Sequence, residues 1–245
     1  MNISKKEPII IAHRGASKDA PENTLAAFAL AVQHGCDAIE LDIHLSVDNE
    51  FIVCHDEHIN RTTNGSGKIA DMTVPQLKSF DCGQWFNEKF RGEKIPLLEE
   101  VFELVPSHIL INIELKIPHK YPDIERKLTN FLIRKNRIDS VVVSSFDHQC
   151  LHRLKKLESR VKIGLLYMSN LVEHYQYTRL FNVPIYSLHP YFLNIGEEDI
   201  RKAKKKNLEV YTWTVNEEKE MAKLIQAGVT GIITDCPQKL KLIRG

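Results

Sequence analysis

Short β-branched runs alternate with segments of helical period along nearly the whole chain. Strand-like runs lie at residues 9–12, 38–43, 51–54, 109–115, 141–145, 162–166, 184–188, 209–215 and 231–234. Between the runs, apolar side chains recur at the spacing of one helix face, as in Leu25, Phe28, Ala29 and Val32. This alternation predicts parallel strands, because consecutive strands that are joined by a helix run in the same direction.

Polar residues and glycines mark the expected ends of three of these helices. Asn23 is the predicted N-cap of the first helix, and Gly35 is its predicted stop. Asp147 is the predicted N-cap of a helix in the middle of the chain. Asn216 is the predicted N-cap of a helix that ends at Gly228.

One link in the pattern is too short to hold a helix. Residues 44–50 separate two strand-like runs, whereas a parallel crossover usually needs about a dozen residues or more. The stretch from Ser46 to Glu50 is typical of a hairpin turn, so we expect 51–54 to run antiparallel to 38–43. Eight parallel strands then remain, the number that closes a (β/α)8 TIM barrel of about 250 residues. A doubly wound open sheet is the alternative.

Residues 56–96 interrupt the alternation. They hold the turn sequence Asn64-Gly65-Ser66-Gly67, one short helix start at Thr73-Val74-Pro75, and the aromatic pair Trp85-Phe86. A segment of this length with little regular structure is unusual inside a domain unless it serves as a lid or a binding insertion. We therefore expect a single domain over residues 1–245, with 56–96 as a small insertion beside the active-site mouth.

Composition narrows the class of protein. Hydrophobic residues make up 43% of the chain, and the net charge of +1 creates no global field for nucleic acid or an anionic membrane. Five cysteines without a Cys-x-x-Cys spacing argue against a disulfide framework or a zinc ribbon. The first apolar run has four residues and is not a signal peptide, and no stretch approaches the ~18 residues of a membrane span. We expect a soluble cytoplasmic protein without stable membrane association or a nucleic-acid partner.

Four polar clusters close apolar strands of this pattern. They are His13-Arg14-Gly15, Glu40-Leu41-Asp42, His55-Asp56 and Glu114-Leu115-Lys116. A strand has a side-chain period of two, so Glu40 and Asp42 share one face. Three carboxylates from two strands favour a hard cation such as Mg²⁺ or Ca²⁺, since zinc prefers His or Cys. The alternative is that some of these acids form structural salt bridges with Arg14 or Lys116.

The basic and aromatic residues of the strand ends suggest further roles. His13 and His55 are candidates for a general acid and a general base. Arg14 and Lys116 are candidates for holding an anion such as phosphate. Trp213 stands at a strand end, where it is either a core residue or a flat wall for substrate; we favour the wall.

Two other histidines are weaker candidates. His44 shares the face of Glu40 and Asp42, so it is a candidate ligand or a neighbour of the ligands. His189 stands in Ser-Leu-His-Pro at the end of a strand and is a candidate for the barrel mouth.

The order and spacing of the motifs carry a family resemblance. The chain resembles the glycerophosphodiester phosphodiesterases, of the small bacterial cytoplasmic kind, from residue 9 to about residue 238. Each motif is weak by itself, but together they are specific. Besides the four clusters, they are Pro21-Glu22-Asn23-Thr24, Arg61-Thr62-Thr63-Asn64-Gly65, Ile95-Pro96-x-Leu98, Thr212-Trp213-Thr214-Val215-Asn216 and Ile233-Thr234-Asp235.

The resemblance implies a fold and a set of roles. The family has a (β/α)8 barrel with an insertion after the second strand. His13 and His55 would be the acid–base pair, with His13 as the base and His55 as the acid in the first step. One divalent cation, Mg²⁺ or Ca²⁺, would be held by three carboxylates, those of Glu40, Asp42 and Glu114. Arg14 and Lys116 would hold the phosphate, while His44 is not counted as a ligand.

The reaction that follows is metal-dependent hydrolysis of a small-molecule glycerophosphodiester to an alcohol and sn-glycerol 3-phosphate. Two alternatives remain open. One is a lysophospholipase D-like activity, with an apolar groove formed by Trp85, Phe86, Phe90, Tyr191 and Phe192. The other is a barrel that binds phosphodiesters without turnover. A homo-oligomer is compatible with the sequence.

Overall fold

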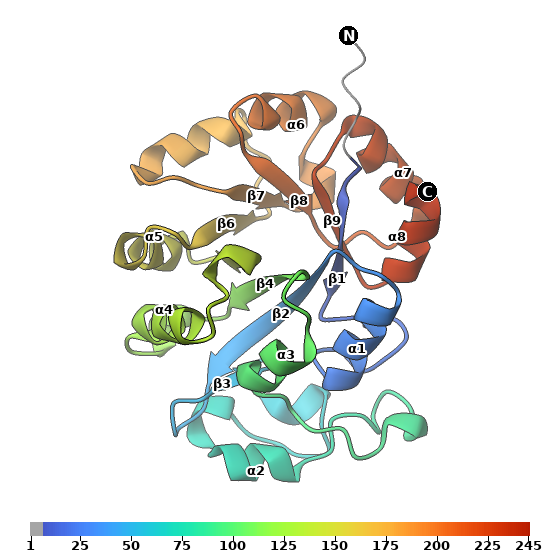
Figure 1. Ribbon diagram of the computed structural model, residues 1–245, viewed down its shortest axis with the longest axis vertical. Coiled ribbons are helices and arrows are strands. Elements are labelled where there is room, and N and C mark those ends of the chain that lie inside the picture. The colour runs from blue at the N-terminus through green and yellow to red at the C-terminus, as the bar shows by residue number, and fades with distance from the viewer. Residues whose placement is uncertain (1–6) are drawn as a thin grey trace.

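The eight parallel strands close into a barrel that is surrounded by helices, as the sequence predicts (Figure 1). The computed structural model describes residues 7–245, so residues 1–6 of the predicted domain lie outside the described residues. Pairing of β1 with both β2 and β9 closes the ring. The barrel strands are β1 (Ile9–His13), β2 (Ala38–Leu45), β4 (Leu110–Leu115), β5 (Val141–Ser145), β6 (Lys162–Tyr167), β7 (Ser187–Pro190), β8 (Glu209–Thr212) and β9 (Gly231–Thr234).

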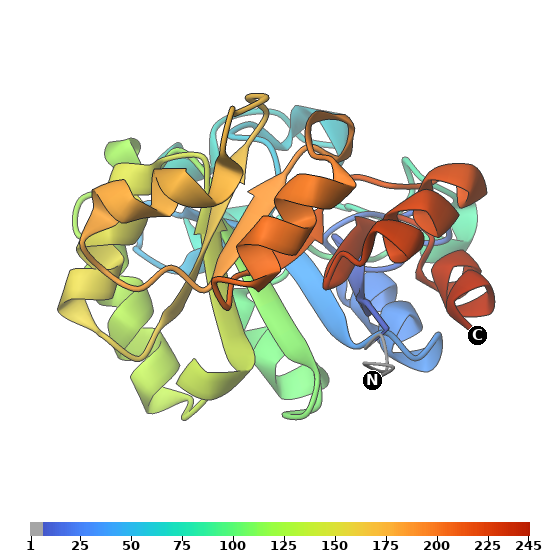
Figure 2. The same ribbon diagram turned by 90° about the horizontal axis from the view of Figure 1, so that it is seen from above.

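Helices connect successive strands on the outside of the barrel (Figures 1 and 2). In the final connection, α8 packs against β1, and the Arg244 guanidinium donates to the Pro8 carbonyl at 3.1 Å. The α-helices of the ring are α1 (Leu25–Gln33), α3 (Leu98–Leu104), α4 (Ile124–Arg134), α5 (His148–Leu157), α6 (Glu197–Lys204), α7 (Glu218–Ala227) and α8 (Pro237–Arg244). The 3₁₀ elements between the strands from β4 onward are η4 (Pro118–Lys120), η5 (Ile138–Ser140), η6 (His174–Phe181) and η7 (Phe192–Asn194).

Most strands match the expected ranges to within one or two residues at each end, but two strands differ by more. The run 184–188 is replaced by β7 at Ser187–Pro190, because Pro184 has no N–H to donate to a ladder. The run 209–215 ends early at Thr212. Beyond that point, Trp213 forms only an isolated bridge with Tyr191, and Val215 donates to the Ile233 carbonyl at 2.9 Å.

The predicted hairpin arm is present. Strand β3 (Phe51–Val53) runs antiparallel to β2, with Val53 opposite Ile43, and the Ser46 N–H donates to the Glu50 carbonyl at 3.1 Å. Residues 56–96 follow this arm and form the cyan and teal region outside the ring in Figure 1. They contain η1 (Ile59–Arg61), η2 (Ile69–Asp71), α2 (Val74–Ser79) and η3 (Glu88–Phe90). Their apolar residues share a small separate core with the arm: Ile52, Cys54, Ile59, Ile69, Leu77, Cys82 and Ile95.

Several predicted helix ends are confirmed. The Asp147 carboxylate accepts from the Cys150 N–H at 2.9 Å and caps α5. Helix α7 ends at Gly228, whose φ is +82°. Helix α1 ends at Gln33, and Gly35 follows with a φ of +74°.

The two predicted asparagine caps are wrong. Thr24, rather than Asn23, caps α1 by accepting from the Ala27 N–H at 3.2 Å. Asn216 lies one residue before Glu217, which occupies the N-cap position of α7. Both asparagine side chains instead donate to carboxylates of the barrel mouth, where a charge-assisted hydrogen bond is stronger than a helix cap.

The interior of the barrel changes from apolar to polar along its axis. Strand alternation places Ile11 on the same face as His13, and Ala38 on the same face as Glu40. Ile11 and Ala38 pack with Tyr211 in a small apolar cluster inside the ring. One end of the barrel is therefore filled with apolar side chains, while the carboxyl ends of the strands present charged ones. Within residues 7–245, no helix combines the length and apolar character needed to cross a membrane.

Candidate active site

Most of the predicted site residues line one cavity at the carboxyl ends of the strands. Its volume is about 110 Å³. Charged and polar side chains form one part of the wall: His13, Arg14, Glu40, His55, Asn112, Glu114 and Lys116. The remaining wall is mainly apolar and is formed by Phe146, Leu166, Trp213, Thr214 and Ile233. The cavity thus combines an ionic side with an apolar side.

The three predicted metal ligands lie together. One oxygen each of Glu40, Asp42 and Glu114 lies within 4.8 Å of the other two. Strand register explains the grouping, since Asp42 and Glu114 are directly paired on β2 and β4, and Glu40 lies one pleat away. Glu40 and Asp42 are buried, and the Glu114 side chain is 12% exposed.

Burial of these carboxylates leaves negative charge that is only partly compensated. Burial and the charges of Asp42 and Glu114 raise the pKa of Glu40 well above its usual value. Burial and Asp42 likewise raise the pKa of Glu114. Burial also acts to raise the pKa of Asp42, but the cationic Arg14 and Lys116 outweigh it and lower that pKa. An oxygen-only cluster with excess negative charge fits a hard divalent cation.

Arg14 reaches the cluster through an unusual backbone conformation. Its φ is +55°, and the Arg14 N–H donates to Glu40 Oε2 at 3.1 Å. Its guanidinium donates to Glu22 Oε1 at 2.8 Å and lies 3.3 Å from Asp42 Oδ2. The next residue, Gly15, has a φ of +86°, and a Cβ there would come within 2.6 Å of the Ala27 backbone.

Lys116 lies on the other side of the carboxylates. Its ammonium donates to Glu114 Oε1 at 2.7 Å and lies 3.6 Å from Asp42 Oδ1. Both cations therefore form the salt bridges that were the alternative to anion binding, and both also line the cavity. The two roles are compatible, because each residue has N–H groups beyond those used in the salt bridges.

His13 is held by a carboxylate from the far end of the chain. Its Nδ1 lies 2.6 Å from Asp235 Oδ1. Asp235 also accepts from the Ser17 hydroxyl at 2.9 Å and the Asn216 amide at 2.6 Å. Burial would raise the pKa of Asp235, but these bonds outweigh it and lower it to about 2. An ionised Asp235 selects the Nδ1–H tautomer of a neutral His13 and leaves Nε2 for other partners.

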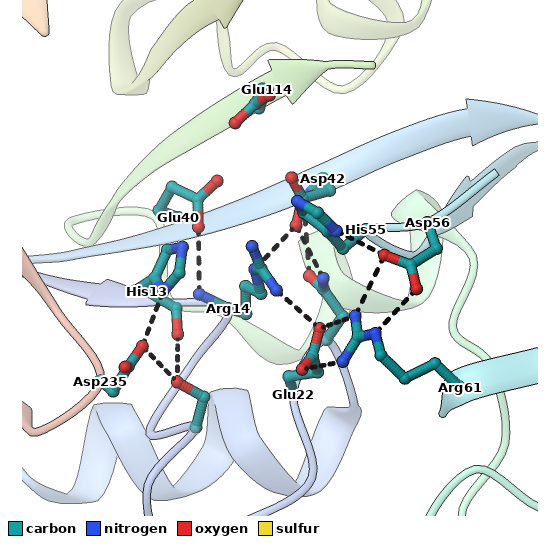
Figure 3. Close-up of polar contacts among 12 residues, drawn as sticks. His13, Arg14, Glu22, Glu40, Asp42, His55, Asp56, Arg61, Glu114 and Asp235 are labelled. Atoms are coloured by element: carbon teal, nitrogen blue, oxygen red, sulfur yellow. Dashed lines mark hydrogen bonds and ion pairs between the residues drawn. The ribbon is translucent and has the colours of Figure 1, made fainter. Parts of the chain in front are cut away.

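His55 has a similar partner next to it in sequence. Its Nδ1 lies 2.6 Å from Asp56 Oδ1. Hydrogen bonds from Arg61 and His55 lower the pKa of Asp56 to about 2. Burial is the main cause that lowers the pKa of His55, and it outweighs the opposing charge of Asp42. Figure 3 shows the two histidines on either side of Arg14, each with its aspartate.

Trp213 forms an apolar wall of the cavity. Its indole N–H donates to the His189 carbonyl at 2.7 Å. Its ring makes edge contacts with Phe146 and Tyr191, both at 5.6 Å between centroids. The indole is therefore fixed in orientation beside the catalytic candidates.

The weaker histidine candidates lie outside the cavity wall. His189 is fully buried inside the barrel, bonded to the Ser187 hydroxyl at 2.8 Å, and burial lowers its pKa to about 3. The expectation that His189 lies at the mouth is therefore wrong, because β7 continues to Pro190. His44 is bonded to the Tyr121 hydroxyl at 2.8 Å and to the His55 carbonyl at 3.1 Å, so it supports the backbone of His55.

The aromatic pair of residues 56–96 does not belong to the cavity wall. Trp85 and Phe86 contact each other at 5.7 Å, and the Trp85 indole donates to the Cys82 carbonyl at 2.8 Å. Phe86 also contacts Phe90 at 5.8 Å. These aromatics pack on one another within the insertion. Of the five predicted groove residues, Tyr191 and Phe192 touch the wall: the Tyr191 ring contacts Trp213, and the Phe192 N–H donates to the Trp213 carbonyl at 3.2 Å.

Four charged residues contact the site although no role there was predicted for them from the sequence: Glu22, Asp56, Arg61 and Asp235. Asp56 stood in the His55-Asp56 cluster, and the other three were visible only as letters of family motifs. For Asp235 a signal was available, because an acidic residue directly after the last barrel strand must lie at the catalytic end. For Glu22 and Arg61 there is no such signal, since Glu22 lies in a turn and Arg61 at the end of the short 3₁₀ helix η1, away from the barrel strands.

Comparison with known proteins gives concordant matches. The sequence model of the glycerophosphoryl diester phosphodiesterase family matches residues 13–239. A glycerophosphodiester phosphodiesterase from Caldanaerobacter subterraneus subsp. tengcongensis is 45% identical over 234 residues, covering 95% of this chain and 96% of that protein. A human lysophospholipase D is 29% identical over 267 residues, covering 94% of this chain and 84% of that protein.

A solved structure matches the fold closely. It is an Oleispira antarctica phosphodiesterase in complex with the product sn-glycerol-3-phosphate. Its TM-score is 0.89 at 29% sequence identity, and the match covers 97% of this chain and 96% of that one.

Proposed function

The chain belongs to the glycerophosphoryl diester phosphodiesterase family, and from this premise we propose that it hydrolyses glycerophosphodiesters such as glycerophosphocholine. The products are an alcohol and sn-glycerol 3-phosphate. The observation that carries the proposal is the grouping in one cavity of two aspartate-held histidines, a carboxylate cluster and two cations. Each of these groups has a part in phosphodiester hydrolysis.

The carboxylates of Glu40, Asp42 and Glu114 would hold one divalent cation, which we assign as Mg²⁺ or Ca²⁺. When bound, the cation supplies positive charge to the phosphoryl oxygens. Arg14 and Lys116 add fixed positive charge on the protein side, with a planar guanidinium suited to two phosphate oxygens. Their existing bonds to carboxylates hold both side chains in place before substrate arrives.

His13 and His55 transfer the protons. One histidine removes a proton from the nucleophile, either the neighbouring glycerol hydroxyl or a water, and the other protonates the departing alcohol. The resemblance assigns His13 as the base and His55 as the acid, with exchanged roles in a second half-reaction. Burial lowers the pKa of His55, so protonation of His55 depends on the anionic phosphodiester, which raises that pKa on binding.

A turnover assay with and without a chelator tests this function. Purified protein with Mg²⁺ or Ca²⁺ should release sn-glycerol 3-phosphate from glycerophosphocholine, and dialysis against EDTA should stop the release. Binding of the substrate without turnover in any of the metal conditions would instead indicate a barrel that only binds phosphodiesters.

Hydrolysis of lysophospholipids is a second candidate function, favoured by an apolar rim on one side of the cavity. The rim consists of Phe146, Met168, Tyr191, Leu193 and Trp213. Phe146, Met168 and Leu193 are 50%, 57% and 61% exposed. Tyr191 and Phe146 both contact Trp213, and the Asn194 amide bonds to the Met168 carbonyl, which holds Met168 beside the segment that follows Tyr191. An acyl chain attached to the glycerophosphodiester could bury apolar surface there.

Two other expectations stay predictions. The cytoplasmic location rests on the cysteine content. The role of residues 56–96 as a cover near the mouth rests on their following His55 directly in the chain. Their contacts with the site through Arg61 are a separate observation.

A further inference from the structure

Arg61 lies between two carboxylates that each hold a residue of the candidate site. Its Nε and Nη2 donate to the two oxygens of Asp56, at 2.7 and 3.2 Å. Its Nη1 and Nη2 donate to the two oxygens of Glu22, at 2.7 and 2.8 Å. Both contacts are bidentate, so one guanidinium fixes the planes of two carboxylates at once.

Each of the two carboxylates that Arg61 binds also accepts a hydrogen bond from a residue of the candidate site. Asp56 Oδ1 accepts from Nδ1 of His55 at 2.6 Å, and Glu22 Oε1 accepts from Nη1 of Arg14 at 2.8 Å. Figure 3 shows the resulting hydrogen-bond network, which runs from His55 through Asp56, Arg61 and Glu22 to Arg14. This hydrogen-bond network joins a proposed acid–base residue to a proposed phosphate-binding residue.

The two acidic residues of this network carry negative charge, as hydrogen bonds from the cationic arginines require. Hydrogen bonds from Arg61 lower the pKa of Asp56 to about 2, and those from Arg61 and Arg14 outweigh burial to lower the pKa of Glu22. Both carboxylates are therefore ionised at neutral pH. The side chains of Glu22, Asp56 and Arg61 are 14%, 32% and 44% exposed, so solvent partly screens these pairs.

We propose that Arg61 is a positioning residue, which sets the orientation of His55 and Arg14 together and connects residues 56–96 to the chemistry. This inference rests on the proposed function of His55 and Arg14. A lysine at this position would keep the charge but not the planar fork, and it could not pair with both carboxylates in two bidentate contacts. The geometry therefore predicts that the shape of the guanidinium matters, in addition to its charge.

The competing explanation is that Arg61 only anchors residues 56–96 to the barrel. An anchor acts through the stability of the protein, and a lysine that keeps one ion pair would largely replace it. A positioning residue acts on kcat and KM in the folded protein. The melting temperature therefore has to be measured beside the kinetic constants.

The experiment compares Arg61→Met and Arg61→Lys with a control in the same segment. Arg91→Met is the control, because Arg91 is 61% exposed and pairs only with Glu88 among the described residues. Turnover of glycerophosphocholine is measured with saturating Mg²⁺ or Ca²⁺. We expect Arg61→Met to lower kcat/KM by about 10²-fold, the cost of displacing a catalytic group by about an ångström. Arg61→Lys should recover the melting temperature but less than about a tenth of the lost kcat/KM.

Two further variants test separately the two sides of the network, from Arg61 to His55 and from Arg61 to Arg14, without changing Arg61. Asp56→Asn weakens the hydrogen bond that orients His55 and should act mainly on kcat. Glu22→Gln weakens the hydrogen bond that orients Arg14 and should act mainly on KM. Arg61→Met should combine both effects, and these two variants keep the inference testable if Arg61→Met does not fold.

The outcomes are distinct. Kinetic constants of folded Arg61→Met within about twofold of Arg91→Met would overturn the inference. Recovery of both activity and melting temperature by Arg61→Lys would also overturn it, in favour of an anchor. Loss of turnover in the wild type and in Arg91→Met alike would instead contradict the proposed function.

Discussion

Asp235 accepts a hydrogen bond from Nδ1 of His13 at 2.6 Å, although 222 positions separate the two residues in the chain. Closure of the barrel explains the contact, because β1 and β9 pair side by side and both residues stand at their carboxyl ends. His55 and Asp56 form the same contact between neighbours in sequence. Two local arrangements of different origin thus fix both imidazoles by Nδ1.

Replacing Asp235 tests whether this contact serves catalysis. Asp235→Asn keeps the size of the side chain but removes the negative charge that selects the Nδ1–H tautomer. We expect kcat for glycerophosphocholine to fall by about 10²-fold or more, similar to His13→Ala, because a positioned acid or base contributes about that much. KM and the affinity for the divalent cation should change little.

Ser17→Ala is the matched control, since it removes a neutral bond to the same carboxylate at 2.9 Å and leaves its charge. Its kcat should stay within a few-fold of the wild type. Near wild-type turnover in Asp235→Asn would show that the aspartate is a structural partner only, and that His13 does not depend on a fixed tautomer.

The barrel was predictable because its signals are local. Apolar alternation, the short link of residues 44–50 and the count of strands depend on neighbouring residues, and the charged clusters stand at strand ends. Grouping of Glu40, Asp42 and Glu114 then follows from parallel register. The predictable part of the site is therefore the part that the strands themselves carry.

The remainder of the site depends on contacts between distant segments. Asn23 and Asn216 have the composition of helix caps, but each bonds to a carboxylate that tertiary structure brings near it. Local propensity is weak beside such bonds, so both caps were predicted wrongly. Arg61 shows the same limit, because its partner Glu22 lies 39 positions away in a turn that is not part of a barrel strand.

Glu40→Gln tests the metal site, because it should have opposite effects on stability in the absence and in the presence of the cation. The raised pKa of Glu40 means that its ionisation at neutral pH opposes folding, so the neutral glutamine should raise the melting temperature of the metal-free protein. In the wild type, Mg²⁺ or Ca²⁺ at about 100 times its dissociation constant should stabilise the fold by about 2.7 kcal/mol. In the variant most of this stabilisation should be absent, and activity with it.

Calorimetric titration of the cation into EDTA-treated protein measures the affinity directly. The control is Glu99→Gln, an acidic residue of α3 that pairs with Lys135 away from the cavity. Its affinity for the cation should equal that of the wild type. Full turnover after thorough chelation would exclude a catalytic metal at this cluster.

His189 should make the protein sensitive to acid. Its pKa is lowered from 6.5 to about 3 by burial, so the unfolded chain binds a proton that the folded protein does not between these values. Stability is therefore lost as pH falls below 6.5, at about 1.4 kcal/mol per pH unit. His189→Gln should remove about 2–3 kcal/mol of the loss in unfolding free energy between pH 6.5 and 4.5, an order-of-magnitude figure from the same relation.

Urea denaturation at pH 7.5, 6.5 and 4.5 measures this difference. His58→Gln is the control, because His58 is exposed. Its acid dependence should match the wild type. If the unfolding free energies of His189→Gln and the wild type change equally with pH, His189 is protonated inside the barrel or reaches solvent.

The apolar rim makes a prediction about substrate choice. Phe146 lines the cavity and contacts Trp213 at 5.6 Å, whereas Trp85 and Phe86 contact each other within residues 56–96. Phe146→Ala should therefore lower kcat/KM for a lysophospholipid by about 10-fold, the loss expected when a phenyl ring no longer covers an acyl chain. For glycerophosphocholine, which has no acyl chain, kcat/KM should stay within about twofold.

The double variant Trp85→Ala, Phe86→Ala is the comparison for this prediction. The sequence alone suggested that this pair lines an apolar groove, but in the structure both rings pack within the insertion and Trp85 is bonded to Cys82. The double variant should lower the melting temperature and keep the ratio of kcat/KM for the two substrates. A changed ratio in the double variant, with an unchanged ratio in Phe146→Ala, would place the apolar subsite on residues 56–96. Such a result would require this segment to move over the mouth during turnover, because neither ring lines the cavity as it stands.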